Sequence, residues 1–137
     1  MAGRKILYVD DEAPLRDLVH TYLELEGYEV STASEGAEAI VLLGRHEFDI
    51  LLLDYHMPGT NGLEVLKYMD RQQIRTRTIV MSGDDGPAVR EACAHYGVTD
   101  CLPKPFDLNV LLSALQESSP PRPSAATEEN SPQHLPS

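Results

Sequence analysis

The sequence predicts an α/β fold: a doubly wound, five-stranded parallel sheet with helices on both faces. Short apolar runs alternate along residues 4–117 with longer segments whose apolar residues recur at helical spacing. The connections are short, and the run from Ile50 to Leu53 is apolar on both faces, as expected of a covered parallel strand. Because crossovers between parallel strands are right-handed, the doubly wound arrangement is the most economical topology.

The five predicted strands are short runs rich in apolar or β-branched residues. They span Lys5 to Val9, Tyr28 to Ala33, Asp49 to Leu53, Thr78 to Met81 and Val98 to Leu102. Pro103 follows the last run, and proline has no backbone N–H to donate to a neighbouring strand. The last strand is therefore predicted to lie at an edge of the sheet.

The five predicted helices begin and end at residues that favour helix termini. Pro14 suits the first turn of the first helix, which Gly27 ends. The apolar residues of this helix recur at helical spacing and are Leu15, Leu18, Val19, Tyr22 and Leu23. The other helices are predicted at Ala37 to Leu43 with a stop near Gly44, at Gly62 to Met69, from Pro87 to Gly97, and from an N-cap at Asp107 through Leu115.

Length and composition indicate one folded domain, at residues 4–117. The chain has 137 residues, 42% of them hydrophobic, which suits a single core. Residues 118–137 hold five of the ten prolines and almost no large apolar side chain. Such a segment cannot bury enough surface to offset its ordering entropy, so a disordered Pro/Ser-rich tail or linker is predicted there.

Charge and hydropathy exclude several functional classes. A formal net charge of −11 argues against binding of nucleic acid or of an anionic membrane. No apolar stretch is long enough to span a bilayer and the start does not resemble a signal peptide, so a cytoplasmic protein is expected. Cys93 and Cys101 have no metal-ligand spacing and form no disulfide framework; reduced, small buried side chains are expected for both.

Polar residues gather where the predicted strands end. They are Asp10 and Asp11 after the first strand, Asp54 after the third, Ser82 and Gly83 after the fourth, and Lys104 after the fifth. In a parallel sheet these ends meet at one edge, where such folds bind their ligands. Solvated charges without a common role would not need to select the same end of separate strands, so this coincidence indicates a site.

The chemistry of that edge follows from its residue types. Three carboxylates in one pocket raise one another's pKa values, and a hard divalent cation relieves the conflict. Oxygen ligands with room for water and phosphate describe a Mg²⁺ site. A carboxylate beside Mg²⁺ can attack phosphorus and form an acyl phosphate. Lys104 can supply an ammonium, Ser82 a hydroxyl and the Gly83 region a backbone N–H to the transferring phosphoryl group.

This arrangement resembles the receiver domain of two-component response regulators, the family of the chemotaxis protein CheY. The matching motifs are VDDE at Val9 to Glu12, D-x-x-M-P at Asp54 to Pro58, SG at Ser82-Gly83 and KPF at Lys104 to Phe106, with Gly62 at its expected place. The resemblance covers residues 4–117. It implies a flavodoxin-like receiver fold with strand order 2-1-3-4-5.

The resemblance also implies roles for individual residues. Asp54 corresponds to the phosphorylated aspartate. Asp11, Asp54 and the backbone carbonyl of His56 correspond to the Mg²⁺ ligands, and Asp10 acts mainly through metal-bound water. Ser82 and Lys104 contact the phosphoryl group. Three further residues are expected to be modulatory: the His56 side chain through water access, Asp84 through its charge, and Gly83 through a backbone N–H close to the phosphoryl group.

Partners follow from the same resemblance. The phosphoryl donor is expected to be a sensor histidine kinase or a histidine phosphotransfer protein, or a small donor such as acetyl phosphate. The output partner is expected at the face of the fourth helix, fifth strand and fifth helix, and a homodimer is possible. Cys101 departs from the family pattern, because receivers commonly carry Tyr or Phe three residues before the lysine. The switch is therefore expected to be weak or to use another group.

Two alternatives remain open at this stage. A haloacid-dehalogenase-like phosphatase also combines an aspartate nucleophile, Mg²⁺, Ser/Thr and Lys, but it usually needs a second aspartate where this chain has His56. A pseudo-receiver would be a non-phosphorylated interaction module, against which the intact set of acids, Ser82 and Lys104 argues. The favoured interpretation is a phosphorylation-operated signalling switch that is not a turnover enzyme.

Overall fold

The computed structural model describes residues 4–83, 86–98 and 100–116. Its elements are β1 (Lys5–Val9), α1 (Ala13–Leu25), β2 (Glu29–Ala33), α2 (Gly36–Arg45), β3 (Ile50–Asp54), α3 (Gly62–Gln72), β4 (Arg77–Ser82), α4 (Pro87–His95), β5 (Asp100–Pro103) and α5 (Leu108–Gln116). The predicted tail, residues 118–137, and Asp84 lie outside the described residues.

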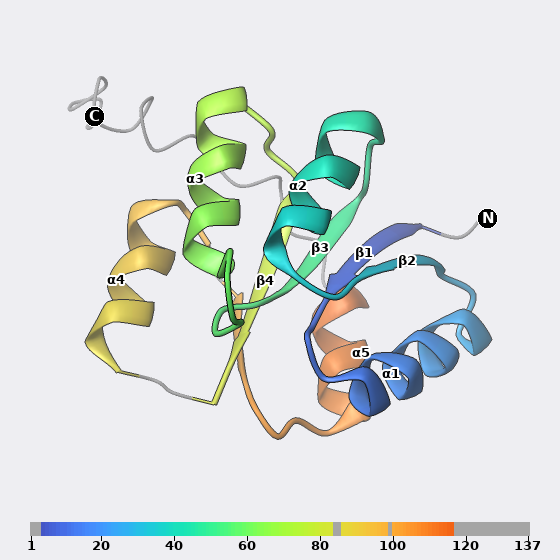
Figure 1. Cartoon of the computed structure of the whole chain (residues 1–137). Coiled ribbons are helices and arrows are strands. Elements are labelled where there is room, and N and C mark those ends of the chain that lie inside the picture. The colour runs from blue at the N-terminus through green and yellow to red at the C-terminus, as the bar shows by residue number, and fades with distance from the viewer. Residues whose placement is uncertain (1–3, 84–85, 99, 117–137) are drawn as a thin grey trace, which may run out of the picture.

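One parallel sheet in the order β2-β1-β3-β4-β5 forms the middle of the molecule (Figure 1). The predicted α/β class, strand order and edge position of the last strand are thereby confirmed. The register keeps the strand ends level, because Val9 pairs with Leu53, Asp54 with Met81 and Ser82 with Pro103. The residues that follow these strands therefore emerge along one edge of the sheet.

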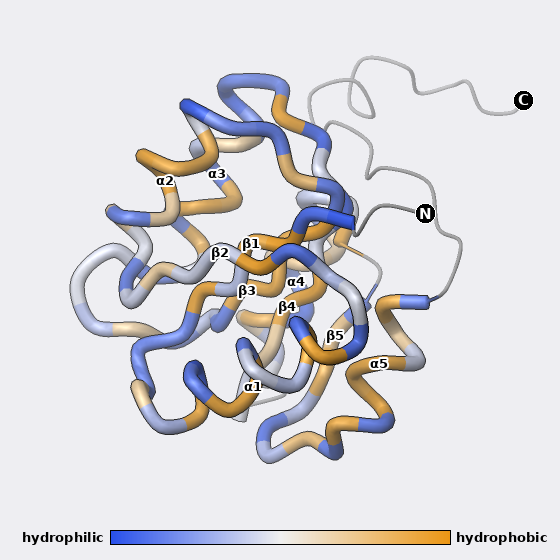
Figure 2. The backbone as a smooth tube through the Cα atoms, turned by 90° about the vertical axis from the view of Figure 1, so that its right-hand side faces the viewer, coloured by the Kyte–Doolittle hydropathy of each residue, from blue (hydrophilic) through white to orange (hydrophobic). Residues whose placement is uncertain are grey.

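Two apolar layers enclose the sheet. Alternate residues of each strand point to opposite faces, so Leu51 and Leu53 pack against α2, α3 and α4, and Ile50 and Leu52 pack against α1 and α5. Every residue of β3 is buried. Figure 2 shows hydrophobic segments of β1, β3 and β4 in the interior between the helices. A carboxylate at the end of β3 is thus delivered from the centre of the core.

Several element boundaries differ by a few residues from those predicted, and two of the differences have a clear structural cause. The second helix continues through Gly44 to Arg45, where a Cβ on Gly44 would lie 2.9 Å from the Tyr68 hydroxyl. Gly44 thus allows α2 and α3 to approach closely, a packing gain that the local propensity of glycine does not reveal. The fifth strand was predicted to begin at Val98 but begins at Asp100. The Val98 N–H bonds the Cys93 carbonyl at 2.8 Å, so Val98 belongs to the turn that ends α4.

Candidate functional site

Three carboxylates from two strand ends meet at the carboxyl edge of the sheet. Asp10, Asp11 and Asp54 each place a carboxylate oxygen within 4.8 Å of the others. Asp10 is fully buried and Asp54 is 3% exposed, whereas Asp11 faces solvent. Two of the three charges are therefore removed from water, and they require compensation from neighbouring groups.

Lys104 supplies part of that compensation. Its Nζ lies 3.2 Å from Asp10 Oδ2, 3.3 Å from Asp54 Oδ2 and 3.0 Å from Glu12 Oε1. The backbone holds the lysine in place, because the Lys104 N–H donates to the Ser82 carbonyl at 2.9 Å. The ammonium thus bridges acids that follow β1 and β3 from its own position after β5.

Asp10 has its own set of hydrogen-bond donors, which the motifs in the sequence do not indicate. The Tyr8 hydroxyl donates to Asp10 Oδ2 at 2.8 Å, and the Glu12 N–H donates to Asp10 Oδ1 at 2.9 Å. Arg16 donates to the Asp10 carbonyl at 2.6 Å. Strand periodicity contained a signal for Tyr8, because residues two apart lie on the same face. No comparable signal marked the contact between Glu12 and Lys104.

Charge and burial perturb the pKa values of the site. Burial raises the pKa of Asp54 to about 6; Lys104 opposes this shift and the nearby Asp10 reinforces it. Burial also lowers the pKa of Lys104, but Glu12, Asp54 and Asp10 outweigh that effect and the net pKa is raised. Asp54 is therefore mostly ionised at neutral pH while it remains more basic than an ordinary aspartate.

The loop between β3 and α3 fixes the position of Asp54. The His56 N–H donates to Asp54 Oδ1 at 3.3 Å, and the Gly62 N–H donates to the Tyr55 carbonyl at 2.9 Å. A Cβ on Gly62 would lie 2.7 Å from the Tyr55 Cα and 3.0 Å from the Asp54 carbonyl oxygen, closer than real Cβ atoms pack. Gly62 therefore lets the start of α3 approach the backbone that carries the acid.

A cavity of about 380 Å³ lies over these groups and is lined by Asp11, Glu12, Asp54, His56, Gly83 and Lys104. Ser82, at the end of β4, lines a neighbouring cavity of about 290 Å³ between α4 and β5. The structure thus brings most of the predicted site residues around one opening and places Ser82 at its side.

The two cysteines differ in their surroundings. Cys93 is buried, as expected, but Cys101 is exposed, so the expectation of a buried Cys101 is wrong. Cys101 is on the edge strand β5, and only one neighbouring strand, β4, covers it within the sheet.

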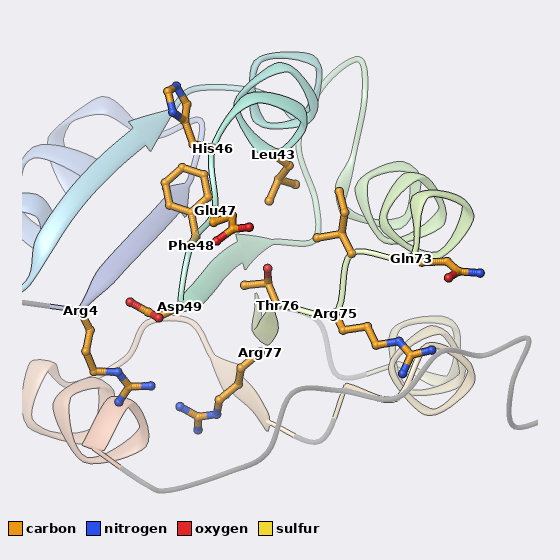
Figure 3. A pocket seen from close by; sticks show the side chains of 11 residues that line it. Arg4, Leu43, His46, Glu47, Phe48, Asp49, Gln73, Arg75, Thr76 and Arg77 are labelled. Atoms are coloured by element: carbon orange, nitrogen blue, oxygen red, sulfur yellow. The ribbon is translucent and has the colours of Figure 1, made fainter.

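A separate cavity of about 600 Å³ lies at the opposite end of the sheet, beside the starts of β3 and β4 (Figure 3). Arg4, Arg75, Arg77 and Asp49 are among the residues that line it, and none of the predicted site residues does. This cavity is larger than the acidic one, but its lining gives it no part in the chemistry of the carboxylate cluster.

The carboxylate cluster suits a hard divalent cation. The candidate metal ligands of the cluster are all carboxylate oxygens, and one side of the cluster is open to solvent. Mg²⁺ requires such an opening because it retains several waters. The residues that could hold it are Asp11 and Asp54, with Asp10 next to them. His56 lines the same cavity.

No helix in the described part of the chain is long and apolar enough to cross a membrane.

Comparisons with known proteins give a consistent result. A family model described as the response regulator receiver domain matches residues 6–116. The chain is 37% identical over 113 residues to the transcriptional regulatory protein CpxR homolog of Haemophilus influenzae, covering 82% of this chain and 48% of that protein. The chain thus spans about half the length of this curated relative.

Solved structures agree with the sequence relatives. The chemotaxis protein CheY4 of Vibrio cholerae has a TM-score of 0.77 at 33% identity, covering 84% of this chain and 98% of that one. The response regulator TrrA of Thermotoga maritima, in complex with Mg(2+)-BeF, has a TM-score of 0.73 at 29% identity, covering 82% and 96%.

Proposed function

Since this chain belongs to the family of response regulator receiver domains of two-component systems, we propose that it is a phosphorylation-operated switch with Asp54 as the phosphoryl acceptor. One observation carries the proposal. The Asp54 carboxylate is buried at the floor of an open acidic cavity, with the Lys104 ammonium 3.3 Å away and Asp10 and Asp11 beside it. This combination offers both a nucleophile and charge compensation for an incoming phosphoryl group.

The proposed reaction is a phosphoryl transfer to an aspartate. An Asp54 Oδ attacks phosphorus while the bond from phosphorus to the donor breaks, and the product is an acyl phosphate. A pKa of about 6 leaves Asp54 ionised at pH 7 and makes it a better nucleophile than an ordinary aspartate. Lys104 compensates charge on the phosphoryl oxygens, and Ser82 at the end of β4 supplies a hydroxyl after a local movement.

Mg²⁺ is the proposed cofactor, held by Asp11, Asp54 and the His56 carbonyl, with Asp10 acting through water. When bound, it neutralises negative charge on the carboxylates and on the phosphoryl oxygens. The chain itself supplies the arrangement, because Tyr8 and the Glu12 N–H hold the Asp10 carboxylate in place. The Mg(2+)-BeF complex of the similar regulator TrrA supports Mg²⁺ as the cofactor.

The proposed partners are those of a two-component phosphorelay. A sensor histidine kinase or histidine phosphotransfer protein supplies the phosphoryl group, and a further partner reads the face formed by α4, β5 and α5. We place the protein in the cytoplasm, where such donors act. His56 and Gly83 line the acidic cavity, so they are positioned to affect the access of water to the acyl phosphate; Asp84 is assigned the same role from the sequence alone.

Mass spectrometry tests the assignment of Asp54. After incubation with acetyl phosphate and Mg²⁺, the wild-type chain should gain one phosphoryl group and Asp54→Ala should gain none. Asp17→Asn is a matched control, because Asp17 is an exposed aspartate on α1. An unlabelled wild type, or equal labelling of the Asp54 variant, would reject the proposal.

The two alternatives give different results. A pseudo-receiver binds its partner equally with and without beryllofluoride, whereas the proposed switch changes affinity. A phosphatase turns over a phosphomonoester many times per protein molecule, whereas the proposed switch takes its phosphoryl group from a phosphohistidine or acetyl phosphate and should leave a phosphomonoester intact.

A further inference from the structure

The two cysteines of the chain meet between α4 and β5. Cys93 lies in the last turn of α4 and is 4% exposed, and Cys101 is the second residue of β5 and is exposed. The Sγ atoms of Cys93 and Cys101 lie 3.2 Å apart, within hydrogen-bond distance. Their sequence separation of eight residues does not require this contact, which results from packing of α4 against the edge strand.

The pair is open to small reagents from one side. Cys101 lines the cavity of about 290 Å³ that also includes Ser82 and Arg90. Cys93 lies behind it in the apolar layer, with Val89 and Val98 in the same cluster. One sulfur is therefore accessible to a solute, and the other is in direct contact with the first.

The chemistry of the pair is asymmetric in the same way. A hydrogen bond with Cys93 lowers the pKa of Cys101 to about 7, against the opposing effects of burial and of Asp100. The same hydrogen bond, together with burial, raises the pKa of Cys93. Because the thiolate is the form that peroxides oxidise, Cys101 is the sulfur that reacts first and Cys93 is the one that resolves it.

We propose that Cys93 and Cys101 are an oxidation-sensitive dithiol that closes to an intramolecular disulfide, with hydrogen peroxide as the oxidant. The Cys101 thiolate attacks a peroxide oxygen, the O–O bond breaks, and a sulfenic acid and water result after protonation. The Cys93 sulfur then attacks the Cys101 sulfur, the S–O bond breaks, and a second water leaves. Two thiols and one peroxide thus become one disulfide and two waters.

The disulfide joins the carboxyl end of α4 to the edge strand. It would restrict movement of α4 against β5, next to Ser82 at the end of β4. That this restriction affects signalling rests on the proposed function, which assigns the output to the face of α4, β5 and α5. Formation of the bond itself does not involve Asp54.

Peptide mapping of the full chain tests the bond. Reduced protein is treated with near-equimolar hydrogen peroxide, alkylated, and cleaved before aspartates, which separates Cys93 on residues 85–99 from Cys101 on residues 100–106. The two peptides should be recovered as one disulfide-linked species that dithiothreitol separates. Cys93→Ser and Cys101→Ser are matched controls and should give no linked species.

Three outcomes would overturn the proposal. They are alkylation of both cysteines after peroxide, stable over-oxidation of Cys101 with Cys93 still a thiol, and chain-to-chain dimers through Cys101. Asp54→Ala should form the bond as readily as wild type, so a failure of phosphorylation is distinguishable from a failure of oxidation.

Hydrogen exchange tests the mechanical consequence. Amides of residues 87–95 should exchange several-fold more slowly in the oxidised wild type than in the reduced one, and peroxide should leave them unchanged in Cys93→Ser. Equal exchange in the two wild-type forms would contradict the claim that the bond restrains α4.

Discussion

At the scale of single residues, the site is an unfavourable concentration of negative charge. Asp54 is held with its pKa raised to about 6, although Lys104 lies 3.3 Å away and the His56 N–H bonds it. Folding therefore brings a carboxylate into an environment that favours its protonated form. This conflict predicts two measurable effects, one on stability and one on cation affinity.

The first prediction concerns stability and pH. Asp54 has a pKa of about 6 in the folded chain and 3.8 as a model group, so the folded state holds the proton more tightly. This stabilisation is complete below the unfolded pKa and is lost as the pH rises through the folded pKa, between about pH 4 and 6. In metal-free buffer at pH 7.5, Asp54→Asn should therefore raise the unfolding free energy by up to about 3 kcal/mol.

Urea denaturation at pH 7.5 and pH 4 measures the effect. The gain should nearly disappear at pH 4, where wild-type Asp54 is protonated in the folded state and about half protonated in the unfolded state, and it should shrink when Mg²⁺ is added at pH 7.5. Asp17→Asn, an exposed change on α1, should leave stability nearly unchanged. A pH-independent gain would mean that charge is not its cause.

The second prediction concerns Lys104 and cation binding. Its ammonium lies 3.2 Å from Asp10 and 3.3 Å from Asp54, so it opposes a divalent cation at the same carboxylates. Lys104→Met removes the charge and keeps the length of the side chain. The Kd for Mg²⁺ should fall by up to about tenfold, or about 1.4 kcal/mol.

Isothermal titration calorimetry of the unphosphorylated protein provides the measurement. Lys67→Met is the matched control, because Lys67 is a half-exposed lysine of α3 whose Nζ lies 3.7 Å from Glu64. Its Kd should match that of wild type. Weaker Mg²⁺ binding in Lys104→Met would show that the lysine organises the carboxylates more than it repels the cation.

At the scale of elements, the start of α3 determines where Asp54 sits. Gly62 opens this helix in van der Waals contact with the backbone of Asp54 and Tyr55, and Asn61 caps it by accepting from the Glu64 N–H at 3.2 Å. The helix and the acid are thus positioned together. A change at the helix terminus is expected to reach the site through the backbone.

The third prediction compares two glycines. In Gly62→Ala the new methyl would meet the Tyr55 and Asp54 backbone, which cannot move without the site, and stability should fall by about 1–3 kcal/mol. In Gly44→Ala the methyl would meet only the Tyr68 hydroxyl, the far end of a flexible side chain. Higher helix propensity should then leave stability unchanged or raise it by up to about 1 kcal/mol.

The two glycine variants are compared by urea denaturation, which measures stability, and by labelling with acetyl phosphate, which measures the site. Gly62→Ala should lose labelling in conditions where it remains folded, and Gly44→Ala should label like wild type. Similar behaviour of the two variants would contradict the close-approach argument for Gly62.

At the scale of the whole molecule, the fold was predictable because local signals agreed with one another. Apolar runs such as Ile50 to Leu53, with helix signals such as Pro14 and Gly27 between them, left few topologies open. The acidic part of the site was predictable for a related reason. In a parallel sheet, strand ends are also ligand-binding ends, so residues such as Asp10, Asp54 and Lys104 could be grouped before any contact was known.

Contacts that depend on how helices pack could not be predicted. Gly44 within α2, the turn at Val98 and the meeting of Cys93 with Cys101 all depend on the approach of a helix to its neighbour. The pairing of Arg77 with Asp100 depends on register, because Ile79 rather than Arg77 lies opposite Asp100 in the sheet. Sequence periodicity assigns a residue to one face of a helix or strand, but it does not determine which neighbouring side chain that residue contacts.

Two arginines attach α5 to the rest of the molecule, at the end opposite the site. Arg77 Nη2 lies 2.8 Å from Asp100 Oδ2 and donates to the Ala114 carbonyl at 2.8 Å, and Arg4 donates to the Leu115 carbonyl at 3.2 Å. Figure 3 shows both side chains extending toward α5. Their positive charge also suits the carboxyl end of a helix. The edge strand, its neighbour and the last helix are thus held by one buried guanidinium.

The last prediction tests this link as a unit. Arg77 is 5% exposed, and its Nε and Nη1 have no hydrogen-bond partner among the described residues, so it depends strongly on Asp100. Asp100→Asn should destabilise the fold by about 1–3 kcal/mol, because it leaves a buried charge uncompensated. Adding Arg77→Met should recover part of the loss, since no buried charge then remains. As a control, Glu64→Gln in the exposed pair with Lys67 should cost about 0.5 kcal/mol or less.

A double-mutant cycle by urea denaturation gives the coupling between Asp100 and Arg77. Faster amide exchange in residues 108–116 of Asp100→Asn would locate the loss of stability in α5. Additive effects of Asp100→Asn and Arg77→Met would contradict the link, because independent sites would then account for the stability of the edge strand and the last helix.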